Sequence, residues 1–569
     1  MSNLNNTKSN KIVDGVKKKL NVVFMGGVGE IGKNMTLFEY GKSVVVLDCG
    51  LSFPTSDMPG IDVVIPDFGY LKTKKEQIKG LILTHGHEDH IGAVSFFLKE
   101  FPKVPVFGTK LTLGLLQHKL IEHGITSATL KEVTDRSMCQ LGDFSAEFIN
   151  VTHSVAGSLA VCLSCGAGKI LHTGDFKIDY TPIGSETMNL GRFAELGKQG
   201  VLLLMADSTN VDHEGYTLSE SVVADTMNKI FAENKGRRLI VATFASNIDR
   251  LGMIIDLAIK HKRKIAISGK SMANAIETAE RIGYMTVDRA QFVDINRVEG
   301  IDDGKLCILA TGTQGEPMSS LTRMASGEFN KVQIGENDTI VLSSSQIPGN
   351  ERDVYNVINN LYRLGAKVIY NRLEAIHSSG HACREELKLI QSLVKPKYFI
   401  PVHGEYRHLK MHSQLAEEMG VKKKNIVLAE VGDCVTIDSN GIKIKSKVEA
   451  GAVLVDGLGI GDISDFVLKD RLTLSEDGIL IIAVGIGKET RTIVSGPELI
   501  SRGCFTLGDE SATQMQDEIK SMVREQLKAT PLLQSSIPAL KQALQKLVRK
   551  YVKTNLKRYP MILPIILEM

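Results

Sequence analysis

Residues 81–93 read LILTHGHEDHIGA, and this segment decides the fold. An apolar run is followed by a polar turn and then by the apolar helical pattern of residues 91–101, which predicts a strand, a turn and a helix. The turn carries four potential metal ligands: His85, His87, Asp89 and His90. A chance grouping would have to place three of the chain's 14 histidines within six residues at a strand end. Imidazole nitrogens and a carboxylate suit zinc or manganese, so the segment predicts a metal site.

The sequence around this segment predicts an α/β protein. From residue 21 it contains the short β patterns NVVFM, MTLFEY and SVVVLDCG, with Gly41 and Lys42 placed as a hairpin turn would require. Strand and helix patterns then alternate as far as residue 213, which assigns residues 20–213 to the first part of one domain.

Residues 214–376 alternate more regularly between helix and strand patterns, which predicts an inserted, doubly wound parallel domain. Residues 377–448 add a helix and a β-rich stretch that returns to the first domain, and residues 449–569 predict a linker and a small α+β domain. Residues 1–19 are polar and basic without apolar periodicity, so we expect a disordered arm.

Composition narrows the class of protein. The 569 residues are 43% hydrophobic and 23% charged, enough for two to four domains. No apolar run approaches the 18 or so residues of a membrane span, and the polar start lacks the apolar stretch of a secretory signal, so we expect a cytoplasmic protein without a membrane partner. The eight cysteines are too dispersed for a disulfide framework. Cys162 and Cys165 form a CxxC in an apolar segment, which we interpret as buried strand, with a metal or redox site as the alternative.

Net charge is only +3, so a polyanion site has to come from local clustering. Residues 541–558 contain seven Lys or Arg and no acidic residue. On a helix they would form a basic face for RNA or an acidic partner, and a solvated face of an oligomerising tail is the alternative.

A second glycine-rich motif suggests a different site. Gly27, Gly29 and Gly32 spell GxGxxG after a strand, and Asp48 ends a later strand, as in a dinucleotide-binding fingerprint. Such a loop must open a helix, whereas the residues that follow are strand-like. We therefore interpret the loop as a turn between sheet strands.

The HxHxDH pattern resembles the metallo-β-lactamase superfamily, which implies an αββα sandwich and two divalent ions, zinc first, with manganese or magnesium possible. Further ligands are then expected at strand ends, and His153 in VTHSVAGS and Asp175 in ILHTGDFKID fit. The resemblance assigns His85, His87 and His153 to one ion and Asp89 and His90 to the other, with Asp175 bridging. Such a pair of ions can share a hydroxide that attacks phosphorus. A supporting role for His172 or Thr173 is left open.

Three later motifs resemble the β-CASP nucleases of this superfamily and, within them, the bacterial ribonuclease J family. They are MADSTN at 205–210, SSGHA at 378–382 and PVHGEYRH at 401–408, and residues 310–325, 343–351 and 455–463 also resemble that family. The resemblance implies that His403 completes the second metal shell and that Asp89 and Asp207 are catalytic. His381 would stabilise the phosphorane or protonate the leaving 3′ oxygen.

The same resemblance implies a pocket for a 5′-phosphate. Its residues would be His377, Ser378, Ser379, Gly380 and His381, with Phe244, Ala245 and Ser246 of a second loop. Phe244 could stack on a base. The chain departs from the family twice: THSVAGS stands where THSIPDS is expected, and HSSGHAC places Cys383 where a hydroxyl is usual.

The resemblance implies a ribonuclease that degrades RNA from a 5′-monophosphate end, 5′ to 3′, and also cuts internally, in mRNA turnover and rRNA maturation. It also implies a homodimer or homotetramer, association with a paralogue, and RNA-degradation or ribosome-associated partners. One alternative keeps the metals and changes the substrate, to DNA or to a small thioester or lactam. The other is a non-catalytic RNA-binding paralogue or scaffold subunit, against which the seven intact ligand positions argue.

Overall fold

The computed structural model describes residues 19–55, 57–316, 318–345, 350–457, 459–505, 510–530 and 536–569. The chain forms two compact units: the described residues up to Ser52 with Ile65–Ala452, and Phe53–Val64 with Val453–Met569. The predicted arm, apart from Lys19, lies outside the described residues, as do parts of the segments 310–325, 343–351 and 455–463.

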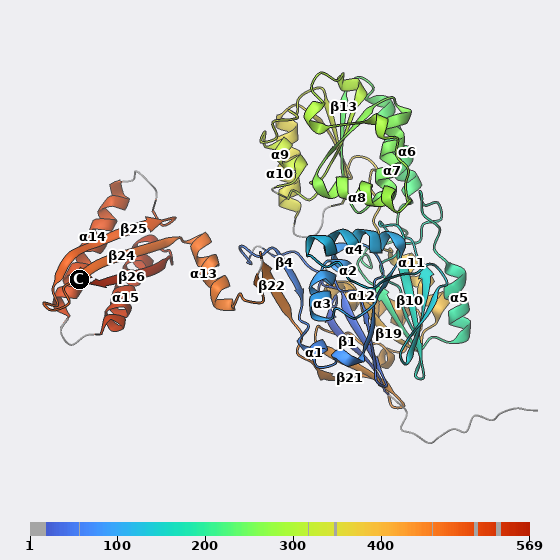
Figure 1. Ribbon diagram of the computed structural model, residues 1–569, viewed down its shortest axis with the longest axis horizontal. Helices are drawn as coiled ribbons and strands as arrows, with labels where there is room; N and C mark the ends of the chain where they lie inside the picture. Colours follow the sequence, from blue (N-terminus) through green and yellow to red (C-terminus); the bar gives the residue numbers. More distant parts are fainter. Residues whose placement is uncertain are drawn as a thin grey trace, which may run out of the picture. The chain divides into compact units, whose positions relative to one another are not determined.

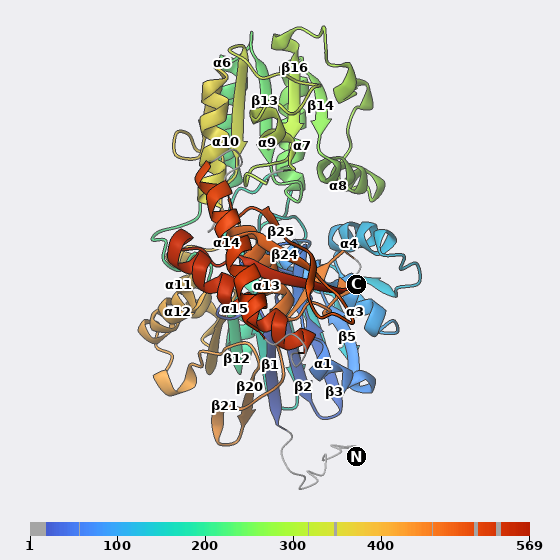
Figure 2. The ribbon, with the colours of Figure 1, turned by 90° about the vertical axis from the view of Figure 1, so that its left-hand side faces the viewer.

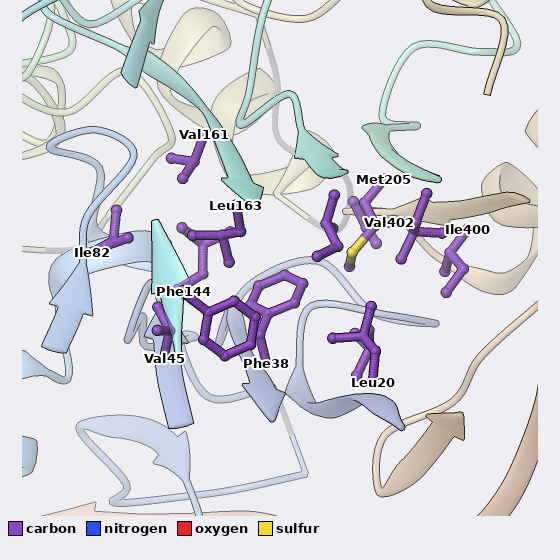
Figure 3. Close-up of a cluster of buried hydrophobic side chains, with 14 of the residues drawn as sticks. Leu20, Phe38, Val45, Ile82, Phe144, Val161, Leu163, Met205, Ile400 and Val402 are labelled. Carbon is purple, nitrogen blue, oxygen red and sulfur yellow. The ribbon is translucent and has the colours of Figure 1, made fainter. Parts of the chain in front are cut away.

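Two sheets pack face to face in the first unit. The eight-stranded sheet runs β21 (Gly441–Lys447), β20 (Asp433–Asp438), β1 (Leu20–Gly26), β2 (Met35–Tyr40), β3 (Ser43–Leu47), β5 (Ile78–Ile82), β6 (Val106–Gly108), β7 (Leu130–Glu132) (Figure 2). The six-stranded sheet runs β19 (Tyr398–Val402), β12 (Leu203–Asp207), β11 (Gly168–His172), β10 (Leu159–Cys165), β9 (Phe144–Asn150), β8 (Met138–Leu141). Apolar side chains from both sheets meet between them, such as Phe38 and Val45 from one and Phe144 and Met205 from the other (Figure 3). The hairpin predicted at Gly41 is present, since Tyr40 pairs with Ser43.

Helices cover the outer faces, which gives the αββα sandwich. α5 (Leu190–Gln199), α11 (Arg384–Val394) and α12 (Tyr406–Glu418) bury apolar residues against the six-stranded sheet. Four helices lie in the segments that connect strands of the eight-stranded sheet: α1 (Gly69–Lys72), α2 (Glu88–Ile91), α3 (Val94–Glu100) and α4 (Lys110–Glu122). The predicted helix at 91–101 is found mainly as α3, whereas α2 carries Asp89 and His90 of the ligand-rich segment.

The inserted domain is a six-stranded, all-parallel sheet, as predicted. Its order is β15 (Phe292–Val293), β14 (Lys264–Ser268), β16 (Leu306–Ala310), β13 (Arg238–Thr243), β17 (Asp338–Ser343), β18 (Lys367–Tyr370). α6 (Glu220–Glu233), α7 (Ile248–Lys260) and α8 (Lys270–Arg281) bury their apolar sides with Leu239 and Val241. α9 (Ser320–Ala325) and α10 (Glu351–Arg363) pack with Ile240 and Ala242 in a second core cluster. Figure 1 shows these two helices on the other side of the sheet from α6 and α7. Helices on both faces are the doubly wound arrangement.

The second unit contains a three-stranded sheet of order β25 (Ile493–Arg502), β24 (Ile479–Ile486), β26 (Met561–Glu568). α14 (Glu510–Ala529) and α15 (Ile537–Leu556) cover one face, and α13 (Asp465–Glu476) precedes the sheet. A smaller sheet joins β23 (Gly459–Ile460), β22 (Ala452–Asp456) and β4 (Val63–Pro66). The sequence predicted a small α+β domain here but gave no indication of β26, which pairs in parallel with β24.

Two further predictions concerned the CxxC cysteines and the absence of a membrane span. Cys162 and Cys165 lie on β10, buried and half-buried, and both are free thiols, which fits the strand interpretation. None of the helices in the described part of the chain is long and apolar enough to cross a membrane.

Candidate metal centre

The predicted metal ligands follow the carboxyl ends of four strands, and two of them, Asp89 and His90, lie on the short helix α2. His85, His87, Asp89 and His90 follow β5, His153 follows β9, Asp175 follows β11, and His403 follows β19. Their ligand atoms form two groups, each within 4.8 Å: one of His85, His87 and His153, and one of Asp89, His90, Asp175 and His403. The fold therefore brings together all seven side chains.

The first group consists of three buried imidazoles. His87 Nδ1 lies 3.1 Å from both His85 Nε2 and His153 Nε2. Burial lowers the pKa of His87 to about 4 and holds the pKa values of His85 and His153 well below the usual range. Because the Gly380 carbonyl takes the Nδ1 proton of His153, the lone pair of its Nε2 points toward His87. A divalent cation satisfies such a donor set, so the residues fit a metal.

The second group combines two carboxylates with two imidazoles. Asp89 Oδ2 lies 3.1 Å from His403 Nε2 and 3.5 Å from His90 Nε2. Burial opposes protonation of His90, but Asp175, Asp89 and Asp48 raise its pKa well above normal. The pKa of His403 is likewise raised against burial, chiefly by Asp175. A cation bound between these imidazole nitrogens and carboxylate oxygens would replace such a proton, so this group also fits a metal.

One oxygen of Asp175 faces both groups. Its Oδ2 lies 3.2 Å from His90 Nε2 and 3.3 Å from His403 Nε2. The same atom lies 3.8 Å from His85 Nε2 and 4.0 Å from His153 Nε2. A carboxylate oxygen in this position is suited to bridge two ions.

Further residues hold the ligands in place from behind. Asp48 Oδ2 lies 2.8 Å from His90 Nδ1, and Asp48 Oδ1 accepts a 2.8 Å hydrogen bond from the Thr84 amide. The carbonyl of Gly380 lies 2.6 Å from His153 Nδ1, and Thr209 Oγ1 lies 2.7 Å from His403 Nδ1. Such partners fix the ring orientation and the tautomer of a ligand histidine. The sequence did not predict that Asp48 would support a ligand histidine. Asp48 had stood out only as part of the dinucleotide-like glycine motif.

Asp207 and His381 form an ion pair beside the two groups. Asp207 Oδ2 lies 2.7 Å from His381 Nδ1, and Asp207 Oδ1 accepts hydrogen bonds from the amide and the hydroxyl of Thr209. Burial opposes the charge of both groups. Their mutual attraction nevertheless lowers the pKa of Asp207 and raises the pKa of His381. His381 can therefore carry a proton next to the candidate metals.

The glycine-rich loop supports His403. The Gly27 carbonyl accepts a 2.9 Å hydrogen bond from the His403 amide, and Gly29 and Glu30 form single bridges with Glu405 and Gly404. Gly27 has a φ of 78°, a conformation that favours glycine. The interpretation as a turn between strands is consistent with β1 and β2 on either side. His172 Nδ1 accepts from the amide of Gly174. Thr173 Oγ1 accepts from the amide of Asp207, so both of these residues shape loops at the site.

The residues of the predicted phosphate pocket lie on two adjoining loops. Phe244, Ala245 and Ser246 follow β13 and are half-buried, and β13 pairs with β17 up to Thr243 and Ser343. Ser343 Oγ donates a 2.6 Å hydrogen bond to the carbonyl of Ile376, directly before His377.

Hydroxyls on the second loop already have protein partners. Ser378 Oγ donates to the carbonyl of Leu218 and accepts from Lys177 Nζ, and Ser379 Oγ accepts from Asn210 Nδ2. Cys383, the unusual residue of HSSGHAC, caps α11, and its Sγ accepts from the Thr217 hydroxyl at 3.4 Å. A hydroxyl at residue 383 could make the same contacts. The role of these loops in binding phosphate stays a prediction.

Four segments of the chain match known family models. Residues 28–184 match the metallo-beta-lactamase superfamily and residues 236–361 the ribonuclease J beta-CASP domain. Residues 366–428 match the Zn-dependent metallo-hydrolase RNA specificity domain and residues 466–569 the ribonuclease J C-terminal domain. These matches indicate that the site uses divalent metal.

Whole-chain relatives lead to the same family. The chain is 40% identical to ribonuclease J2 of Bacillus subtilis over 97% of this chain and 100% of the relative. It is 39% identical to ribonuclease J of Synechocystis over 96% of this chain and 86% of the relative. A solved structure from Enterococcus faecalis, a protein of unknown function, shares the fold with a TM-score of 0.51 at 17% identity, over 74% of this chain and all of that one. The chain therefore belongs to the ribonuclease J family of metallo-β-lactamase hydrolases.

Proposed function

We propose that this chain hydrolyses the phosphodiester bonds of RNA, removing nucleotides from a 5′-monophosphate end and also cutting internally. The observation that carries the proposal is the position of Asp175 Oδ2 between the three-histidine group and the His90–His403 pair, with protonatable His381 beside it. The match to an RNA specificity domain and the names of the whole-chain relatives favour RNA as the substrate.

The residues would hold two ions. His85, His87 and His153 provide nitrogen ligands for one, and Asp89, His90 and His403 provide a mixed set for the other, with Asp175 shared. Zinc is the expected metal, since imidazole and carboxylate ligands suit it, and manganese is accepted by the same donors. When bound, two divalent cations activate a water and offset the charge that develops on the phosphate.

The protein supplies the proton. His381 Nδ1 is held against Asp207, which keeps the ring protonated and leaves Nε2 to face the substrate. In this position His381 donates its Nε2 proton to the 3′ oxygen as that oxygen leaves phosphorus. Asp207 orients the ring and stabilises its charge. The 5′-end pocket, from Phe244–Ser246 and His377–His381, places the first nucleotide so that the next phosphate reaches this proton donor.

The chain also fits a homo-oligomer. On β26 the buried residues Ile562 and Ile566 face the helices, while Leu563 and Leu567 point the other way and are 46% and 55% exposed. An apolar sheet face of this kind suits a second copy of the same chain. A paralogue of this family would bind there in the same way. Action in the cytoplasm, in mRNA turnover and rRNA maturation with RNA-degradation or ribosome-associated partners, completes the proposal.

A cleavage assay tests the proposed ribonuclease activity. With Mn²⁺ or Mg²⁺, purified protein is expected to release mononucleotides from 5′-monophosphorylated RNA faster than from RNA with 5′-triphosphate or 5′-hydroxyl ends. His87→Ala and Asp175→Ala are each expected to abolish cleavage. Binding of RNA without cleavage would instead show a scaffold subunit, and cleavage of DNA alone would show a different substrate.

A further inference from the structure

Arg250 is a buried cation that the proposed mechanism does not use. It lies in the first turn of α7 and is 1% exposed. Its guanidinium pairs with Glu220, the first residue of α6, at 2.6 Å. It also donates to the Ser343 carbonyl at 3.1 Å and to His377 Nδ1 at 2.9 Å. A single side chain thus binds three segments that are distant in the sequence.

Of these three segments, the one at His377 belongs to the proposed 5′-end pocket. The loop Phe244–Ser246 ends at Asn247, whose side chain caps α7 by accepting from the Arg250 amide at 3.1 Å. Ser343 ends β17, the neighbour of β13 in the sheet. His377 and Ser378 begin the second wall, and the Ser378 carbonyl also accepts from Arg250, at 3.5 Å. Arg250 therefore contacts the second wall through its guanidinium and the end of the first loop through its backbone amide.

A second buried cation connects this network to the metal ligands. Lys177 lies two residues after Asp175, is 1% exposed, and shares Glu220 with Arg250 at 3.6 Å. Its Nζ donates to Ser378 Oγ at 2.8 Å, and its amide donates to the carbonyl of Thr152, directly before His153. The pocket loops and the candidate metal groups are thus joined through continuous hydrogen bonds.

Arg250 also decides which nitrogen of His377 carries the proton. Arginine has only donors, so Nδ1 of His377 must accept, and the ring proton is on Nε2. That nitrogen lies 3.1 Å from the hydroxyl of exposed Ser345. Burial, followed by the charges of Arg250 and Lys177, holds the pKa of His377 well below its usual range, so the ring stays neutral. His377 therefore directs a neutral N–H toward the Ser345 hydroxyl.

We propose that Arg250 is a positioning residue for recognition of the 5′-terminal phosphate, acting by holding His377 and the Ser378 backbone in register with the loop that begins at Phe244. This inference rests on the proposed function. A lysine cannot replace Arg250, because a single ammonium cannot span the carboxylate, the carbonyl and the imidazole that the planar fork contacts together.

The test compares Arg250→Lys with a matched control. Arg263 is also 1% exposed and lies in the same domain, before β14, where it donates to the carbonyls of Leu306 and Asn234 at 3.0 and 2.6 Å. These contacts are at the opposite end of the sheet from the pocket. The measurement is the ratio of kcat/KM for a 5′-monophosphorylated RNA to that for the same RNA with a 5′-hydroxyl.

Arg250→Lys is expected to lower this ratio about tenfold, mostly through KM for the phosphorylated RNA, with little change for the hydroxyl RNA. Arg263→Lys is expected to keep the wild-type ratio even if it lowers the thermal midpoint. Glu220→Gln, which keeps the shape of the pair and removes its charge, is expected to move the ratio in the same direction as Arg250→Lys.

Each outcome either supports or overturns the positioning role of Arg250. An unchanged ratio in folded Arg250→Lys, or an equal loss on both RNAs, overturns the inference. If circular dichroism shows that Arg250→Lys is unfolded, the ratio for Glu220→Gln decides in its place. A wild-type protein that cuts RNA without preferring the phosphorylated end contradicts the proposed end preference itself, so the two failures are distinguishable.

Discussion

The carboxylate of Asp48 lies 2.8 Å from Nδ1 of His90, on the side of the ring opposite the Nε2 atom that faces Asp175. This contact holds a proton on Nδ1 and leaves Nε2 free to bind an ion. Asp48→Asn is expected to weaken divalent-ion binding about 10- to 100-fold, since the amide keeps the shape but loses the charge. Calorimetric titration of the metal-free protein with Mn²⁺ measures this. Asp438→Asn, which changes only a turn contact to Asn440, is the control, and equal affinity in all three proteins would contradict the role of Asp48.

Gly380 permits the close approach of its own carbonyl to His153. A Cβ at residue 380 would lie 2.5 Å from His153 Cε1 and 2.6 Å from Nδ1, which no side chain can tolerate. Gly380→Ala is therefore expected to displace the His153 ring, to reduce the metal bound per chain and to lower the rate of RNA cleavage by about tenfold or more. Elemental analysis and the cleavage assay measure the two effects. Gly236→Ala, where a Cβ meets nothing within 4 Å, is expected to behave as wild type.

The sequence predicted the part of the site where several ligand-type residues lie close together in the chain. Four ligands on the turn after β5 are a local pattern, whereas His153, Asp175 and His403 acquire meaning only through the family resemblance. Asp48 was missed because a single carboxylate at a strand end has no spacing signal. Only the parallel pairing of β3 with β5 places Asp48 against Thr84 and His90.

Other features depend on tertiary contacts that no local pattern encodes. Lysine and arginine are normally exposed, so the burial of Lys177 and Arg250 could not be predicted from their positions in the sequence. The strand β26 has an irregular apolar pattern interrupted by Pro564, and it is a strand because β24, far earlier in the chain, pairs with it. In contrast, the helix and strand periodicity of the inserted domain was strong enough to predict its parallel sheet.

Replacement of His381 separates proton donation from metal binding. His381 contacts Asp207 at 2.7 Å and lies outside the two groups assigned to ions, although it forms a third His/Asp cluster with Asp175, Asp207 and His403. His381→Gln is expected to lower kcat about 10²- to 10⁴-fold while the metal content stays at the wild-type level. Single-turnover cleavage and elemental analysis on the same samples provide the test. A parallel loss of metal would show that His381 is a ligand and not a proton donor.

The open face of the sheet in the second unit predicts self-association. Charges at Leu563 and Leu567, both exposed on β26, would have to be buried in any contact through that face. The double substitution Leu563→Lys and Leu567→Lys is expected to convert an oligomer to a monomer, as measured by light scattering after size exclusion. Leu364→Lys, at a 38% exposed residue after α10, is the control. An oligomer that survives the double substitution would place the interface elsewhere.

Buried His412 predicts part of the acid sensitivity of the first unit. Its Nδ1 lies 2.9 Å from Ser208 Oγ, and its ring packs against Phe399. Burial lowers the pKa of His412 to about 3, and the charge of nearby Asp207 opposes this shift only in part. In the unfolded chain His412 takes up a proton near pH 6.5, whereas the buried ring stays neutral until the pH approaches 3. The stability that depends on a neutral His412 is therefore complete above pH 6.5 and is lost as pH falls toward 3. Between pH 6 and 4 the free energy of unfolding should fall about 1 kcal/mol per pH unit more steeply in wild type than in His412→Leu. Urea unfolding followed by circular dichroism at several pH values measures both slopes. The other buried histidines are common to both proteins and cancel, so equal slopes would mean that His412 stays neutral on unfolding or is protonated in the fold.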